Sequence, residues 1–191
     1  FCSVATGKPE PVDPFEPVKV AQSVKLMNVK HAVITSVDRD ELKDGGATIW
    51  AETVRAIRHQ SPGTTLETLI PDFAGKWDNL QQIIDVAPEV VSHNIETVRR
   101  LTKGVRKQAK YERSLEVLKR LNDAGIRTKS GMMLGLGESK EEVVESMDDL
   151  INVGVKVLTL GQYLQPTPSH LPVFEFIHPD LFEEFRVLAL D

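Results

Sequence analysis

Five short apolar runs alternate with helical patterns along this chain, and this alternation constrains the fold more than any other feature. The runs begin near residues 31, 64, 89, 126 and 155, and the first reads HAVITSV from His31 to Val37. β-Branched runs of this length are typical of strands. Between the runs, apolar residues recur at helical spacing, as in Leu115, Leu118 and Leu121. The alternation predicts parallel strands joined by right-handed crossovers in one α/β domain over residues 1–191. A barrel and an open doubly wound sheet both fit this pattern.

The ends of these elements are also marked in the sequence. Ser139 and Glu142 form a capping-box pattern that predicts a helix start, and Gly154 is placed to end the same helix. The strand runs are apolar throughout, so we expect strands that are buried on both faces. The chain opens at Phe1 without methionine and stops within a helical pattern at Leu188 to Asp191. We therefore expect an internal piece of a longer protein, truncated at both ends.

Composition excludes several classes of protein. The chain is 41% hydrophobic and 27% charged, which is typical of globular proteins, and its net charge of −5 argues against a nucleic-acid partner. No apolar run approaches the ~18 residues that a membrane helix needs, so we expect no membrane partner. The single cysteine cannot form an internal disulfide. This suits a reducing compartment, and we predict a cytoplasmic protein.

Hydrogen-bonding side chains or glycines follow every predicted strand. Because chemistry in parallel α/β proteins collects at the carboxyl ends of the strands, these residues are the candidates for a site. We expect one edge of a curved sheet to gather the following polar residues: Ser36, Asp38, Asn94, Ser130 and Gln162. Loops are polar in most proteins, so a purely structural interpretation stays open.

Common cofactor motifs are not met. Gly135 and Gly137 resemble the start of a dinucleotide fingerprint, but Lys140 occupies the third glycine position, and no Walker A loop is present. The five histidines show no metal-ligand spacing, and we expect them to be structural or solvated. Only His93 stands at a predicted strand end.

A basic stretch lies between Arg99 and Arg113, where seven Lys and Arg residues are opposed in sequence only by Glu112. In a chain of net negative charge, such a stretch predicts a patch that attracts an acidic partner or a phosphate-bearing ligand, or else a solvated loop and helix face. Tyr111 is the only aromatic residue nearby that could stack on a base, which disfavours nucleic acid.

Several strings together carry a family resemblance. They are TSVDRD at 35–40, DGG at 44–46, PDF at 71–73, HNIETV at 93–98, TKSG at 128–131, GLGE at 135–138 and GQYLQPT at 161–167. In this order, from residue 1 to about 180, the chain resembles lipoyl synthases, which are radical S-adenosylmethionine enzymes. The HNxET and GQYLQPT strings are specific to that family. Phe1-Cys2 resembles the end of the family's CxxxCxxC loop.

The resemblance implies a fold, an activity and a set of cofactors. The fold would be a partial (βα)6 TIM-like barrel of the radical S-adenosylmethionine type, with the five predicted strands as its second to sixth. The superfamily's G-x-I-x-G-x-x-E pattern would run from Gly131 to Glu138, with Met133 in place of Ile and facing the core. The activity would be insertion of two sulfur atoms, at C6 and C8, into protein-bound octanoyl groups. It would use S-adenosylmethionine, two 4Fe–4S clusters and an electron donor.

The resemblance also implies roles for individual residues. Cys2 would be one cluster ligand, and the other cluster cysteines of the family are not in this sequence, so we expect the 191 residues alone to be inactive. The residues expected to bind S-adenosylmethionine are Ser36, Asp38, Arg39, Gly45, Gly46, Asn94, Glu96, Arg113 and Gln162. Octanoylated lipoyl-domain or carrier proteins are commonly acidic, and their docking residues would be Arg99, Arg100, Lys103, Arg106, Lys107 and Lys110.

Two other functions remain open on the sequence alone. One is a biotin-synthase-like sulfur-inserting enzyme of the same superfamily, against which the GQYLQPT string argues. The other is a cluster-free α/β-barrel binding protein or phosphate-utilising lyase. Bound iron and release of 5′-deoxyadenosine would distinguish the radical enzymes from this last class.

Overall fold

The computed structural model describes residues 10–37, 39–106 and 108–190, and it contains one parallel sheet. Cys2, Asp38 and Lys107 lie outside the described residues. The strands lie side by side in chain order: β1 (His31–Thr35), β2 (Thr65–Leu69), β3 (Val90–Ser92), β4 (Arg127–Leu134) and β5 (Val157–Gln162). A doubly wound sheet reverses its strand order at a switch point. The unbroken order therefore decides for the barrel-type arrangement.

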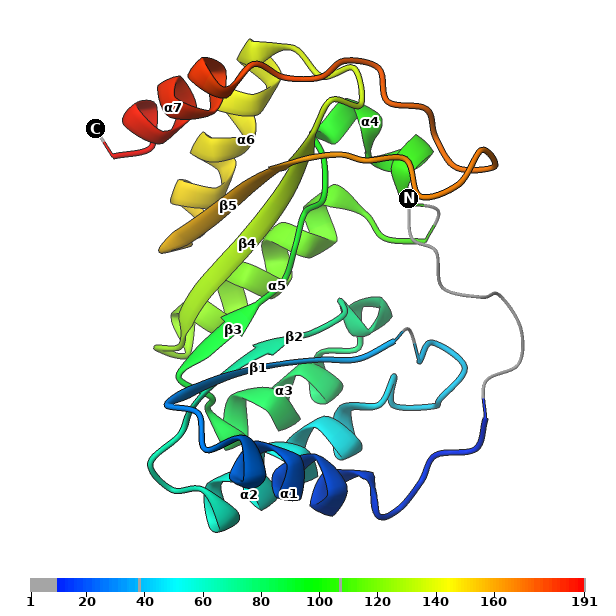
Figure 1. Ribbon diagram of the computed structural model, residues 1–191, viewed down its shortest axis with the longest axis vertical. Helices are drawn as coiled ribbons and strands as arrows, with labels where there is room; N and C mark the ends of the chain where they lie inside the picture. The colour runs from blue at the N-terminus through cyan, green and yellow to red at the C-terminus, as the bar shows by residue number, and fades with distance from the viewer. Residues whose placement is uncertain (1–9, 38, 107, 191) are drawn as a thin grey trace.

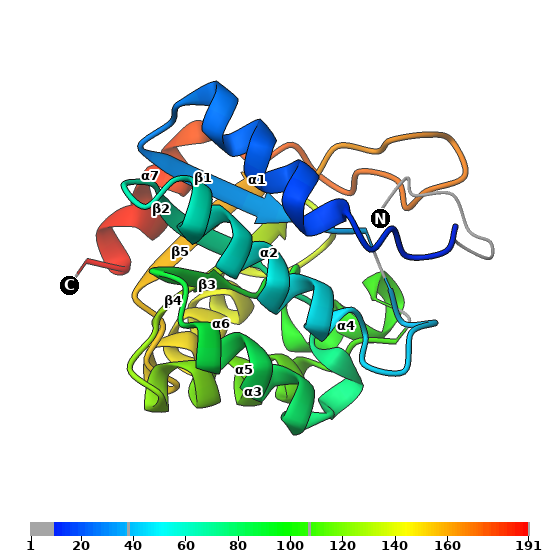
Figure 2. The ribbon, with the colours of Figure 1, turned by 90° about the horizontal axis from the view of Figure 1, so that it is seen from below.

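Seven helices lie before, between or after these strands in the described ranges, together with the short 3₁₀ turn η1 (Phe73–Gly75). They are α1 (Glu16–Met27), α2 (Ala47–Gln60), α3 (Trp77–Val86), α4 (Arg99–Val105), α5 (Tyr111–Asp123), α6 (Lys140–Asn152) and α7 (Pro179–Leu188). Figure 1 shows the sheet curving from β1 (blue) to β5 (orange), and Figure 2 shows the helices α1, α2, α3 and α5 along its outer side.

The hydrophobic core lies between the outer face of the sheet and these helices. Leu66 of β2 packs with α1 and α2, Val91 of β3 packs with α3 and α5, and Leu134 of β4 packs with α5 and α6. Each of these strand residues is at most 1% exposed. Burying one such side chain contributes roughly 1.5–3 kcal/mol relative to leaving it in water.

The expectation that the strands are buried on both faces holds for the central strands β2 and β3, where consecutive residues are buried, but it is wrong for β1 and β5. In β1, Ala32 is 7% exposed but Val33 is 55% exposed, and β5 alternates in the same way. The cause is that β1 and β5 are the two edges of the sheet, so these strands form an arc with an open inner face. The expectation that Met133 faces the core is also wrong, because in β4 this residue lies on the inner face of the sheet, opposite the helices. Met132 packs in the outer core, while Met133 is half-buried on the opposite face of β4.

Helix boundaries follow the local signals closely, with two differences. The predicted capping box is confirmed: Ser139 accepts a hydrogen bond from the Glu142 N–H, and the Glu142 carboxylate accepts one from the Ser139 N–H. The helical pattern expected at Leu188 to Asp191 belongs to α7, but that helix ends at Leu188. The second difference is α4, a seven-residue helix within the basic stretch that the spacing of apolar residues did not predict.

Candidate functional site

Most of the predicted site residues within the described ranges follow the carboxyl ends of the strands, and they form four separate groups. Ser130 lies within β4, level with the end of β3, where its buried hydroxyl accepts a hydrogen bond from the Ile95 N–H. The expected gathering of polar residues at the carboxyl edge of the sheet is thus confirmed for Ser36, Asn94 and Gln162, whereas Ser130 lies in the middle of its strand.

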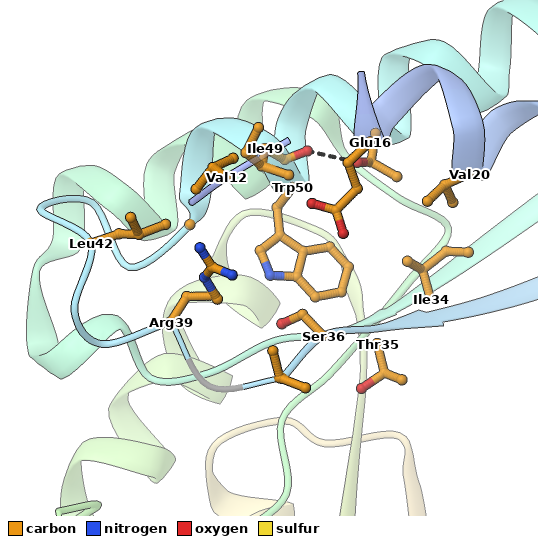
Figure 3. Close-up of a pocket in the computed structure, with 13 residues that line it drawn as sticks. Val12, Glu16, Val20, Ile34, Thr35, Ser36, Arg39, Leu42, Ile49 and Trp50 are labelled. Atoms are coloured by element: carbon orange, nitrogen blue, oxygen red, sulfur yellow. Dashed lines mark hydrogen bonds between the residues drawn. The ribbon is translucent and has the colours of Figure 1, made fainter. Parts of the chain in front are cut away.

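The first group is the loop between β1 and α2. Ser36, Arg39 and Gly46 line an open pocket of about 240 Å³ beside the Trp50 ring (Figure 3). Gly45 and Gly46 have φ of 59° and 82°, a left-handed backbone that glycine adopts at little cost. The Asp44 carboxylate accepts hydrogen bonds of 3.0 Å from the N–H groups of Gly46 and Thr48. The two predicted glycines therefore form the turn that starts α2.

The second group is the turn after β3, and it presents Asn94 and Glu96 next to β4. A Cβ on Gly131 would lie 2.8 Å from the Asn94 Oδ1, so the glycine makes room for this amide. The Glu96 N–H donates to the Gly131 carbonyl at 3.0 Å, and the Met133 N–H donates to the Glu96 carbonyl at 2.8 Å. Burial raises the pKa of Glu96, while a hydrogen bond from Asn94 and the charge of Arg106 act in the opposite direction.

The third group is an ion pair between Asp72, in the segment that joins β2 to α3, and Arg113 of α5. Arg113 Nε lies 2.7 Å from Asp72 Oδ2, and the two side chains are 19% and 10% exposed. Asp72 also accepts a hydrogen bond from the Ala74 N–H and thereby caps η1. Arg113 is therefore held by a carboxylate of its own chain, and its contact to a ligand stays a prediction.

The fourth group surrounds Gln162, the last residue of β5. Its Oε1 accepts from the Ile177 N–H at 2.8 Å, and its Nε2 donates to the carbonyls of Tyr163 and Glu175 at 2.9 and 3.1 Å. The side chain thus braces the segment that follows β5 against Gly135. Its predicted contact to adenine stays a prediction.

A polar cluster on the inner face was not predicted. Glu67 Oε1 lies 2.9 Å from Lys129 Nζ and accepts a 2.7 Å hydrogen bond from the Ser92 hydroxyl, and His31 lies 3.8 Å from Glu67 Oε2. Burial opposes ionisation of Glu67, but these partners together lower its pKa. The signal in the sequence was a charged residue in the middle of the strand run TLETL. The cluster lies on the open face, beside the end of β3.

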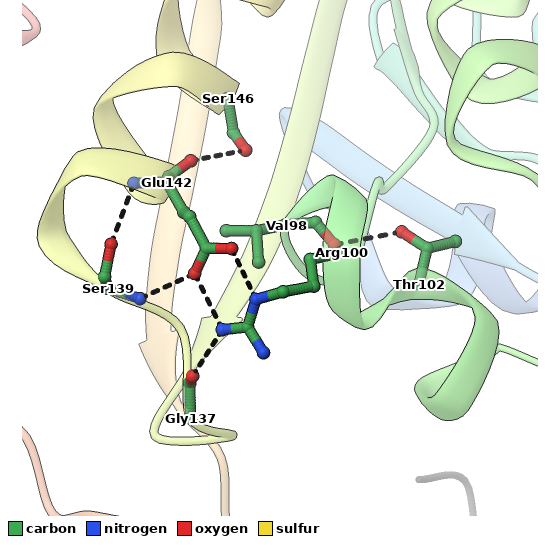
Figure 4. A network of polar contacts seen from close by, with 7 residues as sticks. All are labelled: Val98, Arg100, Thr102, Gly137, Ser139, Glu142 and Ser146. Carbon is green, nitrogen blue, oxygen red and sulfur yellow. Dashed lines mark hydrogen bonds and ion pairs between the residues drawn. The ribbon is translucent and has the colours of Figure 1, made fainter.

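The basic stretch is only partly an exposed patch. Arg100 donates to the Glu142 carboxylate at 2.6 Å and to the Gly137 carbonyl at 2.8 Å, joining α4 to α6 (Figure 4). Hydrogen bonds from Arg100 and from the Ser139 N–H lower the pKa of Glu142 to about 2. These contacts pair the Arg100 charge with an acidic residue that is distant in sequence.

Arg99 is paired in the same way. It contacts Asp149 at 3.0 Å and also contacts Glu112, and its guanidinium lies 4.5 Å from the Tyr111 ring centroid. Glu112 is the only acidic residue within the stretch itself, but in the folded chain α6 adds Asp149 and Glu142 as partners.

Arg106 was expected on the docking face, and this expectation is also wrong. The side chain is half-buried beneath the turn after β3, where it donates to the Ile95 carbonyl and to the Ser114 hydroxyl. Lys103 and Lys110 are exposed, as expected.

Comparisons with known proteins place this geometry in a family. Residues 1–150 match the radical SAM superfamily. A lipoyl synthase of Flavobacterium johnsoniae is 64% identical over 192 residues, covering all of this chain and 67% of that protein. The chain belongs to the lipoyl synthase family. A mitochondrial lipoyl synthase of Nematostella vectensis is 65% identical over 190 residues, covering 99% of this chain and 65% of that protein. The chain thus spans about two thirds of the length of these lipoyl synthases.

A solved structure shares the fold of this chain. The crystal structure of HydG, a maturase of the FeFe-hydrogenase, superimposes with a TM-score of 0.73 at 14% identity, over 95% of this chain and 43% of HydG. At this identity the likeness concerns the fold alone. It confirms the partial barrel expected from the resemblance.

The described residues differ in how well they fit the cofactors of such a family. Within the described ranges, no three His, Cys, Asp or Glu side chains are grouped to hold a metal, and the whole sequence has one cysteine. These residues therefore do not fit a 4Fe–4S cluster, which needs several thiolates. They do fit S-adenosylmethionine as a donor set. Asn94 offers an amide and Glu96 a carboxylate, beside the open inner face of β4.

None of the helices in the described ranges is both long and apolar enough to cross a membrane.

Proposed function

We propose that the protein to which these residues belong is a lipoyl synthase, which inserts two sulfur atoms into protein-bound octanoyl groups. The observation that carries this proposal is the identity of 64–65% to lipoyl synthases over 99–100% of the chain. The product is the protein-bound lipoyl cofactor.

The described residues would bind and orient S-adenosylmethionine. The Glu96 carboxylate can accept hydrogen bonds from hydroxyl or ammonium groups, and the Asn94 amide can both donate and accept. On reduction by one electron, S-adenosylmethionine would release methionine and supply 5′-deoxyadenosyl radical chemistry, which can remove hydrogen from unactivated octanoyl carbons that no side-chain base could deprotonate. Ser36 and Arg39 would approach the methionine end of the ligand from the neighbouring loop.

The clusters would depend on cysteines outside this sequence. Cys2 would be one of three thiolates of the radical-type cluster, and it lies outside the described residues. The second cluster, which would donate the sulfur atoms, and an electron donor complete the expected set. The 191-residue chain alone would then lack activity.

The experiment that tests this function uses the full-length protein, reconstituted with iron and sulfide without oxygen. It is given an octanoylated lipoyl-domain protein, S-adenosylmethionine and a reductant, and mass spectrometry follows 5′-deoxyadenosine and the lipoyl product. Both products are expected. Conversion of dethiobiotin instead would favour the biotin-synthase-like alternative, and the absence of bound iron would favour a cluster-free binding protein.

A matched pair of variants tests the site within this assay. Glu96→Gln removes the carboxylate and is expected to weaken S-adenosylmethionine binding. Glu112→Gln removes an exposed carboxylate of α5 and is expected to leave binding unchanged. Equal binding in the two variants would contradict the assignment of Glu96.

Docking of an acidic carrier would rely on fewer residues than the basic stretch suggests. Lys103 and Lys110 are exposed near the carboxyl edge, while Arg99 and Arg100 are already paired with α6. Exposed charges at an interface mainly change the association rate and its salt dependence. Lys103→Glu with Lys110→Glu should slow carrier association at low salt and leave S-adenosylmethionine affinity unchanged. Association as fast as in the wild type would contradict this docking role.

The cellular compartment of the full-length protein is also a proposal. A cytoplasmic location is predicted from the single cysteine, whereas the Nematostella vectensis relative is a mitochondrial form. Fractionation of cells that make the full-length protein would decide between the two.

A further inference from the structure

A chain of buried hydrogen bonds runs beneath the turn that presents Asn94 and Glu96. Arg106 Nη1 lies 3.0 Å from the Ser114 hydroxyl, which lies 2.9 Å from His93 Nε2, and His93 Nδ1 lies 2.9 Å from the Ile70 carbonyl. Ser114 and His93 are at most 2% exposed. These four groups link the ends of β2 and β3 to α5 and to the loop before it.

The chemistry of the two ends determines the direction of every bond in this chain. A carbonyl oxygen only accepts, so His93 Nδ1 must carry the proton that it shares with Ile70. Nε2 then accepts from the Ser114 hydroxyl, and the Ser114 oxygen accepts from Arg106, which has no acceptor of its own. With a neutral imidazole, each group in the chain has a partner of the right kind.

Arg106 makes a second contact, directly at the site. Its Nη1 lies 3.3 Å from the carbonyl oxygen of Ile95, which belongs to the peptide that leads into Glu96. Glu96 has φ of 66°, in the left-handed region that side chains other than glycine seldom adopt. The N–H of the same peptide donates to the Gly131 carbonyl. The Ile95 carbonyl also accepts from the Thr97 N–H at 2.9 Å. The peptide before Glu96 is therefore held on one side by Arg106 together with Thr97, and on the other by β4.

We propose that Arg106 is a positioning residue for the Asn94–Glu96 pair, which it orients through the Ile95 carbonyl and through Ser114 and His93. This inference rests on the proposed function, because the ligand of the pair is taken to be S-adenosylmethionine. Arg106 itself does not touch the ligand. Its role is to keep the Glu96 backbone in an unfavourable conformation and the carboxylate at the inner face.

The charge of Arg106 has a second effect on the same carboxylate. Among the described residues, the groups that act on Glu96 are Asn94 and Arg106, and Arg106 is in turn surrounded by Asp72 and Arg113. Burial raises the pKa of Glu96, and the positive charge of Arg106 limits that rise. Removing the charge should move the pH at which Glu96 ionises further upward.

The test measures binding of S-adenosylmethionine to the reconstituted full-length protein by equilibrium dialysis, across a range of pH. Arg106→Gln should reduce affinity about tenfold, as expected for one charged hydrogen bond, and should shift the pH midpoint of binding upward. Arg106→Lys keeps the charge but not the planar fork of donors. It should restore the pH midpoint and only part of the affinity. Lys103→Gln, in the same stretch but exposed, should change neither.

The outcomes separate this inference from the proposed function. Wild-type affinity and an unshifted pH midpoint in Arg106→Gln would overturn the role of Arg106, while a wild type that does not bind S-adenosylmethionine would overturn the proposed function. If Arg106→Gln does not fold, Arg106→Lys decides alone. In Arg106→Lys, weaker binding of S-adenosylmethionine at an unchanged pH midpoint supports the inference, and wild-type affinity overturns it.

Discussion

Acidification should destabilise this protein through one buried side chain, His93. Burial lowers the pKa of His93 to about 4, from an ordinary value of 6.5, and the hydrogen bond to the Ile70 carbonyl only partly opposes this. The unfolded chain therefore binds a proton between pH 6.5 and 4 that the folded chain excludes. The stabilising effect of the neutral imidazole is complete above pH 6.5 and is lost as the pH falls towards 4. Linkage gives a loss of roughly 2 kcal/mol in the free energy of unfolding between pH 7 and pH 5.

Urea unfolding at these two pH values, followed by the fluorescence of Trp50 and Trp77, measures this loss. His93→Gln cannot titrate, but its amide can still donate to the Ile70 carbonyl, so the variant should lose less stability on acidification than the wild type by roughly 2 kcal/mol. His59→Gln changes an exposed histidine of α2 and should behave like the wild type. The same loss in His93→Gln and in the wild type would refute the reasoning.

Three further predictions follow from the site. Gly131→Ala places a Cβ against the Asn94 amide, and should cost roughly 1–3 kcal/mol in urea unfolding and weaken S-adenosylmethionine binding; unchanged binding would contradict the role of this close contact. Asp72→Asn leaves the Arg113 guanidinium mostly buried without its carboxylate, and should cost roughly 2 kcal/mol; a loss of only a few tenths would show that the ion pair contributes little. The 191-residue chain, reconstituted with iron and sulfide, should bind far less iron than one cluster per chain, because Cys2 alone cannot supply three thiolates. A full complement of iron with 5′-deoxyadenosine formation would contradict that expectation.

The order and type of the main elements could be predicted from the sequence because their signals are local. The β-branched run at residues 31–37, the spacing of Leu115, Leu118 and Leu121, and the capping box at Ser139 each depend on neighbours a few positions away. Strand–helix alternation then determined that the strands are parallel. The residues after the strands could also be predicted to share one edge, since the carboxyl ends of parallel strands meet there.

The partners of the charged side chains depend on contacts that no local pattern contains. Arg99 and Arg106 lie in one basic run, yet α6 supplies Asp149 for the first, while the second is half-buried under Ile95 and Ser114. Packing between elements distant in sequence decides which guanidinium is solvated, paired or buried. The open inner face has the same origin, because strand periodicity does not reveal whether an arc of strands closes.

By itself, then, the sequence determined the fold class and the residues that collect at the site, because periodicity and turn chemistry act over short distances. Only the tertiary structure decided what those residues do. It showed that Arg106, a predicted docking residue, is half-buried and donates to the Ile95 carbonyl, and that Gln162 is engaged with the segment after β5. The physical reason is that burial and charge pairing arise from the whole packed molecule, and they change the role of a side chain whose sequence neighbourhood stays the same.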